Sequence, residues 1–117
     1  MSDINNRTTY DLKGKRALIT GACGLLGLKH ALALLEIGAS VILTDIDENT
    51  LIEAKKSLEL KKYFGEIKYY FMDVGSEDSI MNVFKKLKKD NIRIDILINN
   101  AAINPKQASL KDNIRTT

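Results

Sequence analysis

The sequence predicts an α/β fold in which a parallel sheet is wound in two directions from its first strand and covered by helices on both faces. Two observations carry this prediction. Short apolar runs alternate with longer segments of helical periodicity along the chain. The first apolar run also leads through three closely spaced glycines directly into an apolar helix. Since right-handed crossovers join strands that run in the same direction, the alternation predicts a parallel sheet with strand order 3-2-1-4.

Four short apolar runs are the predicted strands. The first run has no polar alternation in its middle, so we expect its residues to be buried on both faces of the sheet. The four strands are expected at residues 15–20, 40–44, 67–72 and 94–98.

Three segments between these strands are the predicted helices. Residues 25–37 are apolar almost all round, which requires packing on several sides, and Gly38 ends this helix. Asp47 caps the second helix, which we expect to run to about residue 62, and Ser76 caps the third. Lysines gather in the second half of the second helix and in the last turns of the third, where cations complement the helix dipole.

The composition restricts the class of protein. The chain has 117 residues, of which 44% are hydrophobic, and this fits one globular domain. Its longest apolar stretch is far shorter than the roughly 20 residues that span a bilayer, so we expect no membrane partner. A single cysteine, Cys23, excludes an intrachain disulfide and fits the reducing cytoplasm. A net charge of +3 without interleaved aromatic residues predicts no nucleic-acid partner.

The glycine run after the first strand is typical of a loop that binds phosphate, although a plain glycine turn is an alternative. Gly21 allows a tight turn, Gly24 lets the backbone approach a phosphate, and Gly27 lets the next helix pack close to the strands. That helix points its free N–H groups and the positive end of its dipole at a pyrophosphate. We interpret Cys23 as a small side chain in a tight place, with a reactive thiol as the alternative.

Asp45 follows the second strand, where a carboxylate can accept hydrogen bonds from both hydroxyls of a ribose. The same charge would repel a 2′-phosphate. Since no arginine or lysine follows Asp45 directly or lies in the glycine loop, the sequence favours NAD over NADP as the cofactor. The alternative is an aspartate that starts a helix, but Asp47 is the better cap.

Polar residues also follow the third and fourth strands. Asp73 can reach the exocyclic amine of an adenine, with Val74 near the ring edge; a strand-ending turn is the alternative. Asn99 and Asn100 come directly after a buried strand, so their amides need partners. We expect one amide to tie neighbouring strands together and the other to line the cofactor cleft. The next two residues are alanines, which leave room for a ribose.

All of these candidate residues follow strands at their carboxyl ends, where ligands bind in doubly wound sheets. We therefore expect a Rossmann-like doubly wound parallel sheet, of which this chain holds the first half only. The expected domain is a single NAD-binding half domain over residues 1–117. A polar N-terminal arm is expected over about residues 1–13, and a weakly structured tail or the start of the next helix over about residues 106–117.

Together these motifs resemble those of the short-chain dehydrogenase/reductase family, from Asp11 to about Pro105. The glycine loop, the Asp-Val pair and the Asn-Asn-Ala element each have a counterpart in that family. With Asp45, the predicted cofactor-binding residues are Thr20, Gly21, Cys23, Gly24, Leu25, Leu26, Gly27, Asp45, Asp73, Val74, Asn100, Ala101 and Ala102.

Two positions depart from the common pattern of the family. Leu25 stands where the usual loop has glycine, and Ala102 replaces the last glycine of Asn-Asn-Ala-Gly. The loop spacing is that of the extended subfamily, while the Asn-Asn-Ala element belongs to the common form. Some members that act on sugar-derived substrates are similarly mixed.

The resemblance implies an oxidoreductase that transfers hydride between a nicotinamide cofactor and an alcohol or carbonyl substrate. The family's catalytic serine and Tyr-x-x-x-Lys lie downstream of the Asn-Asn-Ala element, and the sequence ends at Thr117 without them. We therefore assign no catalytic residue and expect the chain to be the N-terminal half of such an enzyme, inactive alone.

An apolar edge at residues 94–98 and parts of the helix at residues 25–37 are expected to lack cover, which predicts low stability alone, or self-association as a homo-oligomer. Two other functions stay open at this point. The first is a non-catalytic module that binds NAD or another adenine nucleotide. The second is a methyltransferase that uses S-adenosylmethionine, although the Asn-Asn-Ala element speaks against it.

Overall fold

The computed structural model describes residues 11–101 of the chain. The predicted tail, Ala102 and all but the last residues of the predicted arm lie outside this range. The described elements are β1 (Arg16–Thr20), α2 (Leu25–Glu36), β2 (Ser40–Asp45), α3 (Glu48–Leu58), β3 (Ile67–Phe71), α4 (Glu77–Lys89) and β4 (Ile96–Asn99). The predicted alternation of strands and helices is therefore confirmed.

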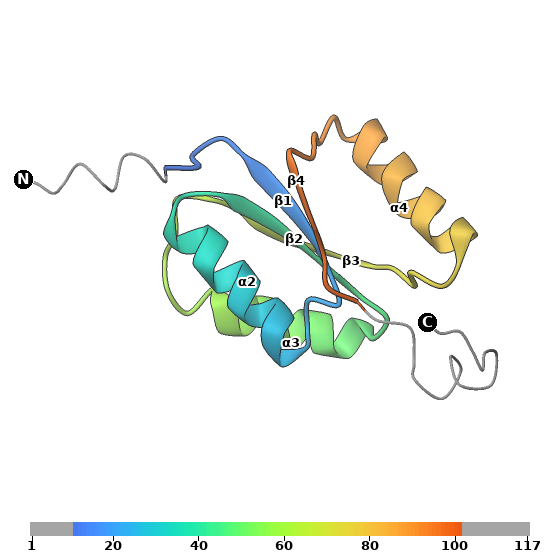
Figure 1. The fold of residues 1–117 in the computed structure, drawn as a ribbon, viewed down its shortest axis with the longest axis horizontal. Helices are drawn as coiled ribbons and strands as arrows, with labels where there is room; N and C mark the ends of the chain where they lie inside the picture. Colours follow the sequence, from blue (N-terminus) through green and yellow to red (C-terminus); the bar gives the residue numbers. More distant parts are fainter. Residues whose placement is uncertain (1–10, 102–117) are drawn as a thin grey trace, which may run out of the picture.

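The four strands form one parallel sheet with the order β3-β2-β1-β4, as predicted. β1 lies in the middle, and Leu18 stands between Ile42 of β2 and Leu97 of β4. Helices α2 and α3 cover one face of the sheet, and α4 covers the other (Figure 1). The chain reverses its winding direction between β1 and β4, so the carboxyl ends of these two strands flank the switch point.

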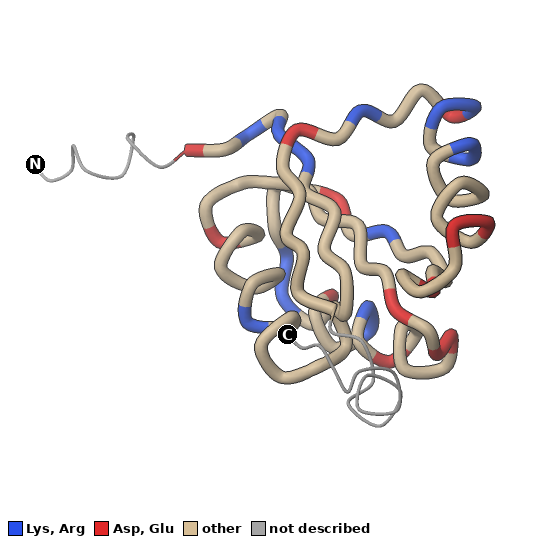
Figure 2. The backbone as a smooth tube through the Cα atoms, turned by 45° about the vertical axis from the view of Figure 1, so that its right-hand side comes forward, with Lys and Arg blue, Asp and Glu red and all other residues tan. Residues whose placement is uncertain are grey.

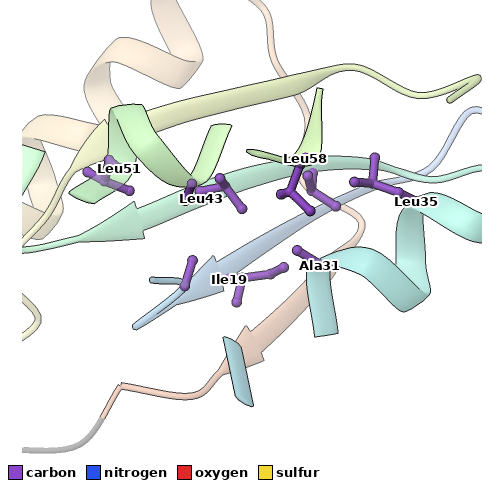
Figure 3. Close-up of a cluster of buried hydrophobic side chains, with 9 residues drawn as sticks. Ile19, Ala31, Leu35, Leu43, Leu51 and Leu58 are labelled. Carbon is purple, nitrogen blue, oxygen red and sulfur yellow. The ribbon is translucent and has the colours of Figure 1, made fainter. Parts of the chain in front are cut away.

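Alternate residues of the central strands build two cores, one on each face. Ile19 and Leu43 face α2 and α3, where they pack with Leu35 and Leu51 (Figure 3). On the opposite face, a second cluster against α4 consists of Leu18, Ile42, Met72, Val83 and Leu87. Burying each such aliphatic side chain contributes about 1.5–3 kcal/mol. The complete burial of the middle of β1 confirms the prediction from its unbroken apolar run.

The predicted caps of α3 and α4 are confirmed. Asp47 Oδ1 accepts hydrogen bonds from the N–H groups of Asn49 and Thr50, at 2.9 and 3.3 Å. Ser76 Oγ accepts one from the Ser79 N–H at 3.2 Å. Figure 2 shows acidic residues at the start of α4 and basic residues at its end, so the charges complement the helix dipole as expected.

Two predicted boundaries were wrong by two residues or more, and the others agree to within one residue. α3 ends at Leu58 rather than near residue 62, because the following segment must turn back to enter β3 and buries part of Tyr63 against the core. β4 begins at Ile96 rather than Ile94. Asp95 stands just before it and bonds β1 through both its backbone and its side chain.

The prediction that α2 packs on several sides was also wrong for the described residues. Only Gly27, Ala31 and Leu35 are buried, which is a single face of the helix. Leu25 is 78% exposed, and on β4 Leu97 is 60% exposed. Within residues 11–101, the prediction that apolar surface at β4 and on α2 lacks cover is therefore confirmed. No helix in this range is long and apolar enough to cross a membrane.

Candidate cofactor-binding site

The candidate residues meet at one edge of the sheet because the strand ends are aligned. Thr20, the last residue of β1, pairs with Thr44 of β2 and with Asn99 of β4. The Met72 N–H donates to the carbonyl oxygen of Asp45 at 2.9 Å, which continues the alignment to the end of β3. The glycine loop, Asp45, Asp73 and Asn100 therefore all follow carboxyl strand ends at this edge.

Two glycines of the loop are required by the fold itself. Gly21 has a φ of +62°, and a Cβ there would lie 2.8 Å from the Cα of Ala101. A Cβ on Gly27 would collide with the carbonyl oxygen of Gly21 and lie 2.8 Å from the Cα of Ala22. We expected Gly27 to permit packing of α2 on the strands; the structure shows that it permits packing on the loop backbone.

Gly24 differs from these two glycines because the fold does not require it. Its φ of −74° is open to any residue, and a Cβ there would meet only the carbonyl oxygen of Gly21, at 3.6 Å. Gly24 is also exposed. The space above it is free for a ligand that approaches the backbone, so the loop fits a phosphate group at this point.

The amides of the loop divide into two sets. The Ala22 N–H donates to the Thr44 carbonyl oxygen at 3.0 Å, and the Cys23 N–H donates to Asp45 Oδ2 at 2.9 Å. These bonds hold the loop against β2. The first turn of α2 begins at Leu25 after a cap without a side-chain hydrogen bond, and it contains no acidic residue. Its N–H groups have no partner within the helix, so they suit an anion.

Asp45 is fixed beside this loop. Its Oδ2 accepts from the Cys23 N–H, and its Oδ1 accepts from the Ile46 N–H at 2.7 Å. Each carboxylate oxygen can accept a further hydrogen bond. Asp47, not Asp45, caps α3. The alternative interpretation of Asp45 as a helix-starting residue is therefore wrong.

Cys23 is half-buried and packs against the core beneath α2 and α3. Burial raises the pKa of its thiol above the ordinary value, partly offset by a hydrogen bond with Thr50, and the Asp45 carboxylate raises it further. A raised pKa lowers the fraction of thiolate, the nucleophilic form. These properties favour the small side chain in a tight place over the reactive thiol.

Asp73 follows β3 at the start of a turn and keeps an exposed carboxylate. Its Oδ1 accepts from the Gly75 N–H at 2.9 Å, and its own N–H donates to Ser79 Oγ at 2.9 Å. The strand-ending turn, which was the alternative to an adenine contact for Asp73, is thus present. The turn also fixes the direction of the carboxylate. Val74 is half-buried against the core under α4.

Thr20 connects the ends of β1 and β4. Its hydroxyl donates to Asn99 Oδ1 at 3.1 Å and accepts from the N–H groups of Asn100 and Ala101, at 2.9 and 3.0 Å. Asn100 Nδ2 donates to the carbonyl oxygen of Gly21 at 3.1 Å. Both asparagine amides therefore hold the Thr20–Gly21 segment. The sequence analysis included Thr20 only because of the family resemblance. Its role in joining the two strands could have been predicted from a threonine at the end of one strand and asparagines at the end of another.

The family model of the short chain dehydrogenases matches residues 15–116. The chain belongs to this family. The 3-oxoacyl-[acyl-carrier-protein] reductase FabG of Thermotoga maritima is 37% identical over 92 residues, which cover 79% of this chain and 37% of the relative. The predicted family is therefore confirmed.

Solved structures show the same relationship. An NAD⁺-bound xylitol dehydrogenase has a TM-score of 0.70 and 36% identity, covering 78% of this chain and 34% of the other. A Pseudomonas aeruginosa RhlG/NADP complex has a TM-score of 0.75 and 29% identity, covering 87% of this chain and 40% of the other. The chain thus spans between about a third and two fifths of the length of these similar proteins.

Proposed function

We propose that residues 20–101 form the part of an NAD-dependent short chain dehydrogenase that binds the cofactor. The observation that carries this proposal is the position of the Asp45 carboxylate, fixed by the Cys23 N–H beside the open N-terminus of α2. The helix end suits the pyrophosphate, and the carboxylate suits the hydroxyls of the adjoining ribose. The cofactor, when bound, supplies or accepts the hydride.

The same geometry favours NAD over NADP. A 2′-phosphate on the adenosine ribose would lie against the Asp45 carboxylate, and the two negative charges would repel each other. Ile46 and Asp47 follow Asp45, so the start of α3 offers no cation to offset this repulsion. The similar proteins include one bound to NAD⁺ and one to NADP, so the preference rests on this chain's own residues.

The reaction that we propose for the whole enzyme is hydride transfer between the cofactor and an alcohol or carbonyl substrate, with a sugar-derived substrate as one class. In this proposal, residues in the part of the family's length that this chain does not match carry the catalytic proton transfer. Within this chain, Thr20, Asn100 and Ala101 hold the end of β4 against the glycine loop. They position the loop and carry no proton in the proposed reaction.

Titration calorimetry with NAD and NADP tests this proposal on Asp45→Asn. Asparagine keeps one side-chain oxygen, which can still accept from the Cys23 N–H, while the Ile46 N–H loses its acceptor and the charge is removed. NAD affinity should therefore fall about tenfold, and the preference over NADP should narrow. Asp47→Asn is the matched control, because it removes the same charge two residues away and asparagine remains a good helix cap. An unchanged ratio of the two affinities in Asp45→Asn excludes Asp45 from the site.

A further inference from the structure

A groove lies near the amino end of β4, away from the candidate cofactor-binding site. Its volume is about 480 Å³, and it is lined by the last turns of α4 and by the connection from α4 to β4. The cofactor-binding site is at the opposite, carboxyl end of the same strand, where Asn100 bonds to the glycine loop. The groove is therefore a separate feature, and a ligand for it does not depend on the proposed function.

The end of α4 gives this groove a fixed shape. Asn91 has a φ of +57°, and this left-handed residue ends the helix. The Asn91 N–H donates to the Lys88 carbonyl oxygen at 3.1 Å, and the Ile92 N–H donates to the Leu87 carbonyl oxygen at 2.8 Å. The two bonds form a Schellman motif, and the side chain of Ile92 packs against the cluster that contains Leu87. The groove is thus built by backbone hydrogen bonds and core packing, without a ligand.

The lining of the groove combines apolar side chains with cations. Phe84, Ile92 and Ile94 contribute apolar surface, and Phe84 is 41% exposed. Lys88 and Arg93 are exposed at the same groove. In the part of the chain that the structure describes, none of the residues that line the groove is an aspartate or a glutamate. This lining suits a ligand that is apolar along its length and negatively charged at one end.

The charges around the groove favour an anion over a second copy of the chain. Residues 84–95 contain five cations and two carboxylates, and Figure 2 shows cations in the last turns of α4 and in the connection to β4. Arg93 Nε donates to Asp95 Oδ1 at 3.2 Å, but a guanidinium has further donors that this bond does not use. A second copy seated on the groove through the same face would bring like charges together.

We propose that this groove binds an amphipathic anion, namely a single alkyl chain that ends in a carboxylate. The alkyl chain lies along Phe84, Ile92 and Ile94, and the carboxylate accepts hydrogen bonds from Lys88 and Arg93. The ligand is a free carboxylate rather than a lipid surface, because a single alkyl chain can enter a groove whereas the plane of a bilayer cannot.

Calorimetric titration of the full chain with sodium decanoate, below the concentration at which it forms micelles, tests this proposal. Decanoate should bind, and octanoate should bind about fourfold more weakly if half of each added methylene is buried. Decyltrimethylammonium has the same alkyl chain with the opposite charge, so it should bind at least about tenfold more weakly than decanoate. Equal binding of these two ligands, or binding to phosphatidylglycerol vesicles without binding of decanoate, overturns the proposal.

NAD provides a test of the location. Saturating NAD should leave the affinity for decanoate unchanged, because the groove and the cofactor-binding site lie at opposite ends of β4. Displacement of decanoate by NAD would place decanoate in the cofactor-binding site, and the assignment to the groove would then be wrong.

A pair of double variants tests the cations. Lys88→Gln combined with Arg93→Gln removes the charges at the groove and should weaken decanoate binding about tenfold. Lys61→Gln combined with Lys62→Gln is the matched control, because it removes the same charge from exposed positions on the α3–β3 connection. Each pair includes one cation that forms a surface ion pair, so the cost to the fold should be similar and small. The control should bind decanoate as the unmodified chain does, and an equal loss in both double variants would contradict the proposal.

A second pair of variants tests the apolar side chains. Phe84→Gln should weaken decanoate binding about fivefold, because it removes apolar surface from the groove. Met81→Gln is the control, since Met81 is 55% exposed on the same helix but does not line the groove. Decanoate binding that is unchanged in Phe84→Gln, or reduced equally in Met81→Gln, would exclude the groove as the binding site.

Discussion

Replacing Gly24 by alanine should weaken cofactor binding and leave the fold nearly unchanged, whereas the same replacement at Gly27 should destabilise the fold. The two glycines lie in one loop, but the structure gives them different surroundings. A Cβ on Gly24 meets only the Gly21 carbonyl oxygen, at 3.6 Å, which is an ordinary contact. A Cβ on Gly27 collides with that same oxygen and lies 2.8 Å from the Cα of Ala22.

The expected magnitudes follow from these contacts. At Gly24, alanine restricts the unfolded chain, which stabilises the fold by about 0.4–1 kcal/mol, and it is a poorer helix cap by a similar amount. The free energy of unfolding should therefore change by less than about 1 kcal/mol. At Gly27, overpacking against backbone atoms costs about 3 kcal/mol, of which the better helix propensity of alanine recovers about 1 kcal/mol. The net loss is about 2 kcal/mol, or about 8–16 °C in melting temperature.

Thermal melts and NAD titrations on both variants check this prediction. Gly24→Ala should melt close to the unmodified protein but bind NAD at least about tenfold more weakly, because the methyl group occupies the space open to a phosphate. Gly27→Ala should melt early and, at a temperature where it is folded, still bind. NAD binding by Gly24→Ala at the original affinity would refute the placement of the phosphate, and an early melt of Gly24→Ala would refute the open space above it.

Two further predictions concern the β4 side of the sheet. The Arg16 N–H donates to Asp95 Oδ2 at 2.9 Å, and this bond, with the guanidinium of Arg93 adding to it, holds the pKa of the Asp95 carboxyl below its ordinary value of 3.8. The carboxylate therefore stabilises the fold above that pH, and its contribution is lost as the pH falls through the lower pKa of the folded state. As the pH is lowered, the melting temperature of Asp95→Asn should fall less steeply than that of the unmodified chain. Parallel curves of melting temperature against pH would contradict this. Leu97 is 60% exposed, so Leu97→Lys should reduce concentration-dependent self-association in sedimentation velocity. Leu60→Lys, at a position 89% exposed on the α3–β3 connection, is the control, and an equal effect of both would count against an interface at β4.

Local patterns were sufficient to predict the arrangement of the fold. Strands and helices were recognised from their periodicity, and the caps Asp47 and Ser76 from residue type at the helix starts. The order of the strands then followed from the right-handed crossover between them. The end of α3 could not be predicted in this way, because residues 59–62 have helical character and only the return to β3 ends the helix.

The sequence predicted where the site lies in the fold, but it did not predict most of the hydrogen bonds within the site. Strand ends carry Asp45, Asp73 and Asn100, so their convergence at one edge follows from a parallel sheet. Which groups remain free for a ligand could not be predicted. The Cys23 N–H is bound to Asp45, and the Asn100 amide to Gly21. Each of these bonds depends on the relative register of two strands.

By itself, the sequence determined the kind and order of the elements, the strand order and the edge where polar residues gather. Periodicity and residue type act within a few neighbouring positions, so they can be recognised without a structure. The tertiary structure alone decided which polar atoms already have hydrogen-bond partners and which backbone atoms each loop glycine approaches. Thr20 and Asn100 are 80 residues apart, and the bond between them exists only because β1 and β4 pair in one register. The loop spacing assigned different roles to Gly24 and Gly27, but only the structure shows that Gly27 packs against the backbone of Gly21 and Ala22 rather than against the strands.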